Sequence, residues 1–243
     1  MSMFSVTIPT LQRAPELPQL VGTLTEHPLV AEILIINNAI TPLPFWNDKV
    51  RVLQPERNVY VNSAWNWGAR EARHELRAFA NDDITFGPAL LHAFHLRLTR
   101  RGVGMIGPHA LAFTGERRRR AFRPVYKRGH GLGTLMFMRK DAFVPIPEDL
   151  LIWCGDDWLF RHQEGRNLTF HGWQIRTPMS VTSGAPEFDH MGQRDTELFY
   201  REYEAQDDPY VVRFRREAAI NWYRGQAARR LNRFVGREVL PWD

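Results

Sequence analysis

Cysteine is nearly absent from this sequence: Cys154 is the only one among 243 residues. A single cysteine excludes an intrachain disulfide framework and is typical of proteins from a reducing compartment. Long hydrophobic runs are also missing, since no apolar stretch reaches the roughly 18 residues that a membrane-spanning helix needs. Residues 1–5 lack the basic region and the long apolar segment of a signal peptide. We therefore expect a cytoplasmic protein without a transmembrane segment.

Two common nucleotide-binding signatures are absent as well. The chain has no Gly-x-x-x-x-Gly-Lys-Ser/Thr loop and no Gly-x-Gly-x-x-Gly segment after a strand. The sequence therefore gives no support for ATP hydrolysis or for redox chemistry with a dinucleotide. What is present is an ordinary globular composition, with 44% hydrophobic and 24% charged residues. Such a composition is enough to bury a sizeable core.

Positive charge is modest in total, at +5, but it is unevenly distributed. Residues 117–120 are four consecutive arginines, and Arg123, Lys127 and Arg128 follow them. The C-terminal part adds Arg213, Arg215, Arg216, Arg224, Arg229, Arg230, Arg233 and Arg237. Such patches attract the phosphates of a nucleotide, a nucleic acid or an anionic lipid surface. A solvated helix face and a basic loop explain them equally well.

Hydrophobic periodicity predicts alternating strands and helices in the first 86 residues. Strands are predicted at 4–8, 32–36, 50–53 and 76–80, and helices at 15–27 and 62–73. This order is typical of a Rossmann-like α/β fold, in which a mostly parallel sheet is flanked by helices.

The rest of the chain continues the pattern less regularly. Helices are predicted at 88–101 and 158–164, and strands at 104–107, 134–138 and 168–176. Residues 117–131 show no clear periodicity and are predicted to form a basic loop. From about residue 196 onward the sequence is helical, charged and aromatic. We expect one domain over residues 1–200 and a basic C-terminal helical extension over 201–243, packed on it.

Two acidic clusters are the strongest chemical signals. Asn81, Asp82 and Asp83 follow a predicted buried strand, and Asp156 and Asp157 lie near the start of a predicted helix. Carboxylates at strand ends are where an α/β protein holds metal-bound phosphates. A carboxylate at a helix start is favoured in its ionised form and can act as a base. Taken separately, a turn or a helix cap explains each cluster at least as well.

The order of several motifs adds to these signals. In chain order they occupy residues 6–13, 35–39, 58 with 65–68, 81–83, 133–140, 156–157 and 190–196. Together they resemble the family 2-type glycosyltransferases with the GT-A fold. The resemblance extends from residue 4 to about residue 200, and it depends on the order of motifs that are individually unspecific. It implies a GT-A domain over residues 1–200 and a sugar transferase that uses a nucleotide-sugar donor.

The resemblance also implies roles for individual residues. The residues implied to bind the donor and its nucleotide are Pro9, Thr10, Arg13, Asn37, Asn66, Asn81 and Asp82. Asp83, together with His190, is implied to hold Mn²⁺ or Mg²⁺ on the donor diphosphate. Asp157 is implied to be the general base, with Asp156 beside it. Contacts to the acceptor or to phosphate are implied for Gly133, Thr134, Trp158, Arg117 and Arg118. The implied reaction is an inverting, in-line displacement at the anomeric carbon.

Two departures from the family pattern keep other interpretations open. Asn37 stands where the family usually has aspartate, so the nucleotide base is not fixed, and Asn81 replaces the first aspartate of the metal motif. These changes leave room for a catalytically silent protein that binds a nucleotide or a nucleic acid. For an active enzyme, the acceptor is either a glycan or lipid-linked precursor or a hydroxylated base in DNA. A base in DNA must first be flipped out of the helix.

Overall fold

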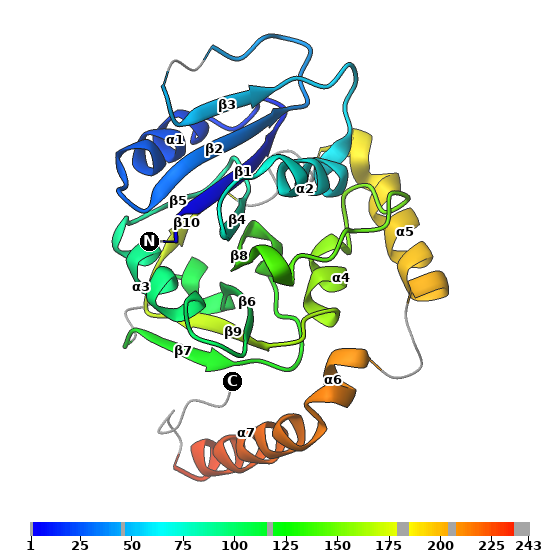
Figure 1. The fold of residues 1–243 in the computed structure, drawn as a ribbon. Helices are drawn as coiled ribbons and strands as arrows, with labels where there is room; N and C mark the ends of the chain where they lie inside the picture. The colour runs from blue at the N-terminus through cyan, green and yellow to red at the C-terminus, as the bar shows by residue number, and fades with distance from the viewer. Residues whose placement is uncertain (1, 45–46, 116–118, 179–184, 204–207, 236–243) are drawn as a thin grey trace.

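The computed structural model describes residues 2–44, 47–115, 119–178, 185–203 and 208–235. Its centre is an eight-stranded sheet with the order β3-β2-β1-β4-β8-β6-β9-β7, and helices cover both faces (Figure 1). The strands are β1 Phe4–Thr10, β2 Val30–Asn37, β3 Val50–Leu53, β4 Leu76–Ala80, β6 Val103–Pro108, β7 Ala121–Pro124, β8 Leu135–Arg139 and β9 Arg166–His171. A second, two-stranded sheet pairs β5 Thr85–Phe86 with β10 Ile175–Arg176. The predicted α/β fold is confirmed.

One half of the sheet is parallel. β1 pairs in parallel with both β2 and β4, and β2 pairs in parallel with β3. β1 is buried along its whole length, and β2 is buried along nearly all of it. Burial of successive residues along a strand is typical of a parallel sheet that is covered on both faces. All four carboxyl ends therefore meet at one edge of the sheet, here called the carboxyl edge.

The other half of the sheet is mixed. β8 runs antiparallel to both β4 and β6, while β6 and β9 are parallel. Because β8 is reversed, its N-terminal end lies beside the C-terminal end of β4. The prediction of a loop over residues 117–131 is wrong for Ala121–Pro124, which form the edge strand β7 against β9. The predicted strand 168–176 is divided by Gly172, whose φ of 77° places it in the left-handed region that suits glycine.

The helices form two layers on opposite faces of the sheet. α1 Leu17–Glu26 and α3 Ala89–Leu98 pack on the face that presents Phe4, Val6 and Ile8. α2 Tyr60–Glu71 and α4 Gly155–Arg161 pack on the other face, which alternate strand residues such as Phe79 and Met136 supply. Gly68 lets α2 approach β1 closely, since a Cβ atom there would overlap the side chain of Thr7.

The C-terminal part is helical, as predicted. It comprises α5 Asp189–Leu198, a π-helical turn over Phe199–Tyr203, α6 Pro209–Arg213 and α7 Arg215–Val235. α7 lies at one end of the molecule beside β7 and β9 (Figure 1). In the part of the chain that the structure describes, no helix combines the length and the hydrophobicity needed to cross a bilayer. The division into residues 1–200 and 201–243 stays a prediction.

Candidate functional site

The first acidic cluster lies at the carboxyl edge, where β1 and β4 end side by side. The hydroxyl of Thr10, the last residue of β1, donates to Asp82 Oδ2 at 2.6 Å. Asp82 and Asp83 are both buried, whereas Asn81 is partly exposed. Burial and the neighbouring charge of Asp83 raise the pKa of Asp82 to about 6, although the Thr10 hydrogen bond opposes the shift. Two adjacent buried carboxylates with hard oxygen ligands fit a divalent cation, which would relieve their repulsion.

The loops after β1 and β2 are joined by a network of amide side chains. Gln12 has a left-handed backbone with φ 60°, and its N–H donates to Thr10 Oγ1. The Gln12 side chain donates to Asn37 Oδ1 at 3.0 Å, and Asn37 Nδ2 donates to Gln54 Oε1 at 2.6 Å. Sequence reasoning selected Thr10 and Asn37 but missed Gln12 and Gln54. Their role depends on a backbone conformation and a strand pairing that no motif encodes.

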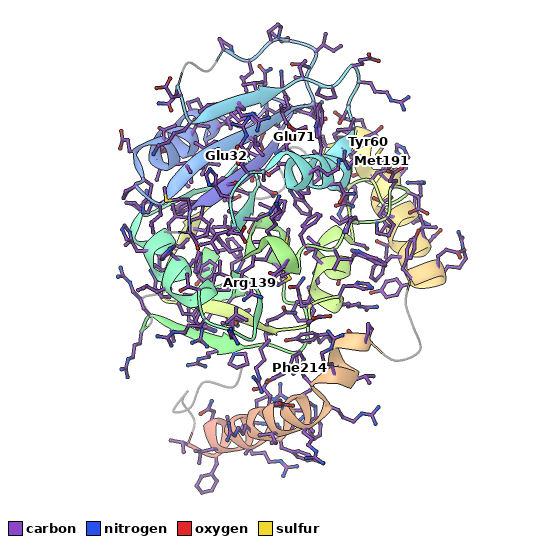
Figure 2. All side chains as sticks on the ribbon, in the orientation of Figure 1. Glu32, Tyr60, Glu71, Arg139, Met191 and Phe214 are labelled. Carbon is purple, nitrogen blue, oxygen red and sulfur yellow. The ribbon has the colours of Figure 1, made fainter. Side chains whose placement is uncertain are left out.

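Arg13 connects this edge to the segment that leads into α5. Its guanidinium pairs with Glu187 at 2.6 Å and lies over the ring of Phe188. Tyr60, at the start of α2, packs edge-on against the same ring, and Figure 2 shows Tyr60 beside α5. His190 follows closely on α5 and is exposed. Among the described residues, no group of three or more His, Cys, Asp or Glu is arranged to hold a metal ion. Asp83 and His190 therefore do not form such a group on their own.

The two acidic clusters come together through the start of β8. The backbone N–H of Asn81 donates to the carbonyl oxygen of Thr134 at 3.0 Å. The preceding residue, Gly133, packs on the second cluster, because a Cβ atom there would lie 3.2 Å from the carboxylate of Asp156. Three consecutive residues, 133–135, thus span the space between the clusters. Both acidic clusters, about 75 residues apart in the chain, therefore contact this segment.

The loop before α4, residues 150–154, is held by hydrogen bonds from two sides. The buried carboxylate of Asp195 accepts the backbone N–H groups of Leu151, Ile152 and Trp153 at 3.1, 2.7 and 3.0 Å. From α2, the Asn62 amide donates to the carbonyl oxygens of Leu150 and Trp153. A charged acceptor with three backbone donors is a strong anchor. Sequence reasoning missed both anchors, since neither lies near the acidic motif.

Cys154 forms the N-terminal boundary of α4 in a left-handed conformation with φ 62°. Gly155 comes next and leaves no space for a side chain, since a Cβ atom would overlap the Asn62 amide. α4 thus begins three residues before the predicted helix start at 158, and Asp156 and Asp157 occupy its first turn. Burial and the nearby aspartates raise the pKa of the Cys154 thiol to about 12, so it is a poor nucleophile.

Arg128 holds both aspartates of the second cluster. Its Nε atom lies 3.0 Å from Asp156 Oδ2 and 3.0 Å from Asp157 Oδ2. Burial and the charge of Asp156 raise the pKa of Asp157 to about 6, although Arg128 and Arg161 oppose the shift. A carboxylate in this range is ionised at neutral pH yet basic enough to accept a proton. The sequence placed Arg128 in a basic loop but gave no sign of this contact.

A groove of about 860 Å³ extends from Arg128 between β7 and α7, and is here called the β7–α7 groove. Four of its lining residues are basic, and Tyr126 and Trp222 add aromatic surface. None of the described lining residues is acidic. The basic residues are Arg123, Lys127, Arg128 and Arg229. Its lining favours an anionic occupant that carries rings or sugars.

Several residues that were predicted to bind donor or acceptor make contacts within the protein itself. The Asn66 amide donates to the carbonyl oxygen of Ile146 and accepts its N–H, so both ends of this side chain hold a loop. The Trp158 indole donates to the carbonyl oxygen of Pro145 and packs on His162. Pro9 is buried within β1, opposite Ile36. Arg117 and Arg118 lie outside the described residues.

Comparison with solved structures identifies the fold. TarS 1–349 from S. aureus matches with a TM-score of 0.57 at 13% identity, covering 86% of this chain and 78% of TarS. TarS 1–349 in complex with UDP-GlcNAc gives 0.58 at 12% identity, covering 91% and 75%. GalNAc-T7 with UDP, GalNAc and Mn²⁺ gives 0.55 at 14% identity, covering 99% and 59%. These similarities show that the chain has the fold of GT-A glycosyltransferases.

The family follows from the sequence comparison. The model of glycosyl transferase family 2 matches residues 5–163, which is more than half of the chain. The chain therefore belongs to glycosyl transferase family 2. No curated protein sequence is significantly similar to it. The family and fold that the ordered motifs implied are confirmed, while the roles of individual residues stay predictions.

Proposed function

We propose that this protein transfers a sugar from a nucleoside-diphosphate sugar to an acceptor hydroxyl, with inversion at the anomeric carbon. The observation that carries the proposal is the bridge between the two acidic clusters. Asn81 is bonded to Thr134, and the neighbouring Gly133 packs on Asp156. These contacts support a donor diphosphate on one side of a short segment and a proton-accepting group on the other. Sugar transfer needs both groups to be held beside the reacting carbon.

The donor side is assigned to the carboxyl edge. Asp83, with Asp82 beside it, would hold Mn²⁺ or Mg²⁺, with His190 as a further ligand. When bound, the cation supplies positive charge that stabilises the departing nucleoside diphosphate. Thr10 keeps Asp82 oriented through the 2.6 Å hydrogen bond. The nucleotide is assigned to the loops after β1 and β2, where Arg13 and Asn37 lie. GalNAc-T7, with UDP and Mn²⁺, offers a precedent for such a site on this fold.

The acceptor side is assigned to Asp157. Its carboxylate takes the proton from the acceptor hydroxyl as the oxygen forms a bond to the anomeric carbon. The bond from that carbon to the diphosphate oxygen breaks, and the nucleoside diphosphate leaves with the electron pair. Asp156 and Arg128 position Asp157, because Arg128 contacts both carboxylates. Asp195 acts indirectly, through the backbone of the loop before α4.

The acceptor itself is assigned to the β7–α7 groove. The groove is lined by four basic side chains, and one of them, Arg128, also contacts Asp157. An anionic acceptor therefore fits better than a neutral one. Both acceptors considered from the sequence, a glycan or lipid-linked precursor and a hydroxylated base in DNA, can supply negative charge near the hydroxyl.

A binding screen tests the donor assignment. Nucleoside diphosphates and nucleotide sugars with different bases are each added to the protein with Mn²⁺, with Mg²⁺ or with EDTA, and the melting temperature is measured. We expect one base to raise the melting temperature, and only when a divalent cation is present, because a ligand that binds the folded state stabilises it. No shift with any nucleotide would contradict the proposed function. Donor binding without turnover of any acceptor would favour the catalytically silent alternative.

The pH dependence of transfer tests the base. We expect kcat/KM to rise as the pH passes through about 6 and then to level off, because Asp157 must lose its proton. In Arg128→Gln, a positive charge that lowers this pKa is removed, so the rise should move to higher pH by roughly one unit. Arg139→Gln is the control, since Arg139 pairs locally with exposed Asp141. An unshifted profile in Arg128→Gln would rule out Asp157 as the titrating base.

A further inference from the structure

α7 presents two different faces. The inner face contacts the body of the protein: Ala228 is buried, and Ala218, Asn221, Gly225 and Arg229 line the β7–α7 groove. Phe214, at the junction with α6, anchors the start of the helix in the core (Figure 2). Arg166 adds an ion pair to Glu217 at 3.0 Å. Among the described residues, these contacts hold α7 to the domain along one side.

The outer face carries an exposed hydrophobic stripe. Ile220, Tyr223, Leu231 and Phe234 have exposed fractions of 51%, 67%, 39% and 90%. The spacings of 3, 8 and 3 residues bring all four onto one side of an α-helix. We call these four residues the outer stripe. Exposed Ala227 lies between its two halves. A contiguous apolar strip that remains in water is unfavourable unless something covers it.

The charges around the outer stripe are of one sign. Arg224 and Arg230 flank it on its two sides, and Arg216 lies about one turn before Ile220 on the same side of the helix. Residues 218–235 contain four arginines and no aspartate or glutamate. The acidic residue nearest in sequence, Glu217, is already paired with Arg166. The surface that covers the stripe must therefore be apolar in the middle and negative at the sides.

We propose that the outer stripe of α7 binds the surface of an anionic lipid bilayer. Apolar and aromatic side chains on one helix face enter the region below the headgroups, while the flanking arginines contact lipid phosphates. A nucleic acid would satisfy the arginines but leave the stripe in water. A second copy of α7 packed on the stripe would bring like charges together. The proposal does not depend on the transfer reaction.

Vesicle flotation with the full chain tests the proposal. We expect little binding to phosphatidylcholine vesicles and strong binding to vesicles that also contain phosphatidylglycerol. Binding to the latter should weaken as salt is raised, because salt screens the arginines. Arg224→Gln and Arg230→Gln should each lower the partition coefficient about fivefold. The double variant Leu231→Ser/Phe234→Ser should lose binding almost completely.

Matched controls separate lipid binding from damage to the fold. Leu96→Ser removes an equally exposed apolar side chain from α3, and Arg139→Gln removes an arginine elsewhere. Both should bind vesicles like the wild type, and all variants should keep the wild-type melting temperature. The proposal is overturned by equal binding to neutral and anionic vesicles, or by stripe variants that still float. The proposal is also overturned if the wild type does not bind vesicles and the stripe variants instead lose self-association or DNA binding.

Discussion

Asp157→Asn is expected to lower the rate of sugar transfer by about 10²–10⁴-fold, the usual contribution of a general base. Asparagine has nearly the same shape as aspartate but cannot accept the proton of the acceptor hydroxyl. Arg128 keeps its two contacts to Asp156, at 3.0 and 3.4 Å, so the start of α4 should stay in place. The measurement is the initial rate of product formation with the donor that the binding screen identifies.

Donor binding should be unchanged in Asp157→Asn. The groups assigned to the nucleotide and the diphosphate lie at the carboxyl edge, on the other side of residues 133–135. The melting temperature with donor and metal should therefore shift as in the wild type. Asp141→Asn makes the same chemical change at an exposed ion pair and should leave both rate and binding intact. A variant that transfers sugar at a near wild-type rate would remove Asp157 from the mechanism.

The parallel half of the sheet could be predicted from the sequence because its signal is local. β2 contains the apolar run Ile33–Ile36, and β4 was predicted with its observed bounds, Leu76–Ala80. Asp82 and Asp83 follow β4 directly, so their position at the carboxyl edge follows from the chain direction alone. Where a strand is apolar throughout and helices alternate with it, few topologies remain.

The meeting of the two acidic clusters could not be predicted in the same way. It depends on β8 running antiparallel to β4, which brings Thr134 to Asn81. Hydrophobic periodicity predicts a strand over residues 134–138, close to the observed Leu135–Arg139, but it does not predict the direction of that strand. The ordered family motifs supplied the connection that the periodicity lacked.

The residues that sequence reasoning missed were missed for one physical reason. Arg128 reaches Asp156 across 28 positions, and Asp195 reaches Ile152 across 43. Gln12 depends on a left-handed backbone that a residue other than glycine or asparagine seldom adopts. Such contacts are made by side chains after the fold has formed, and no spacing in the sequence marks them. They position the predicted groups rather than replace them.

Asp83→Asn is expected to abolish the metal-dependent stabilisation by donor. At a ligand concentration of 100 times the dissociation constant, the wild type should gain about 2.7 kcal/mol of stability. The variant should gain almost none, because a neutral amide binds a divalent cation far more weakly than a carboxylate. The measurement is the melting temperature with the identified nucleoside diphosphate, with Mn²⁺ or with EDTA.

Without ligand, Asp83→Asn should not lower the stability of the protein. Burial and Asp83 raise the pKa of Asp82 to about 6, above its ordinary value of 3.8. A carboxyl whose pKa is raised in the folded state costs stability as the pH rises from its ordinary value through the folded-state value, and the full cost is present above about 6, because the folded protein must then ionise a disfavoured group. Asp83→Asn lowers that pKa, so the unliganded variant should melt no lower than the wild type at pH 8.

A variant that keeps its metal-dependent shift would exclude Asp83 as a ligand. Loss of the shift together with a lower melting temperature would instead indicate damage to the fold, and Asp141→Asn provides the reference for both readings. If two buried carboxylates form a cation site, Asp83→Asn should remove the stabilisation of the liganded protein without destabilising the free protein.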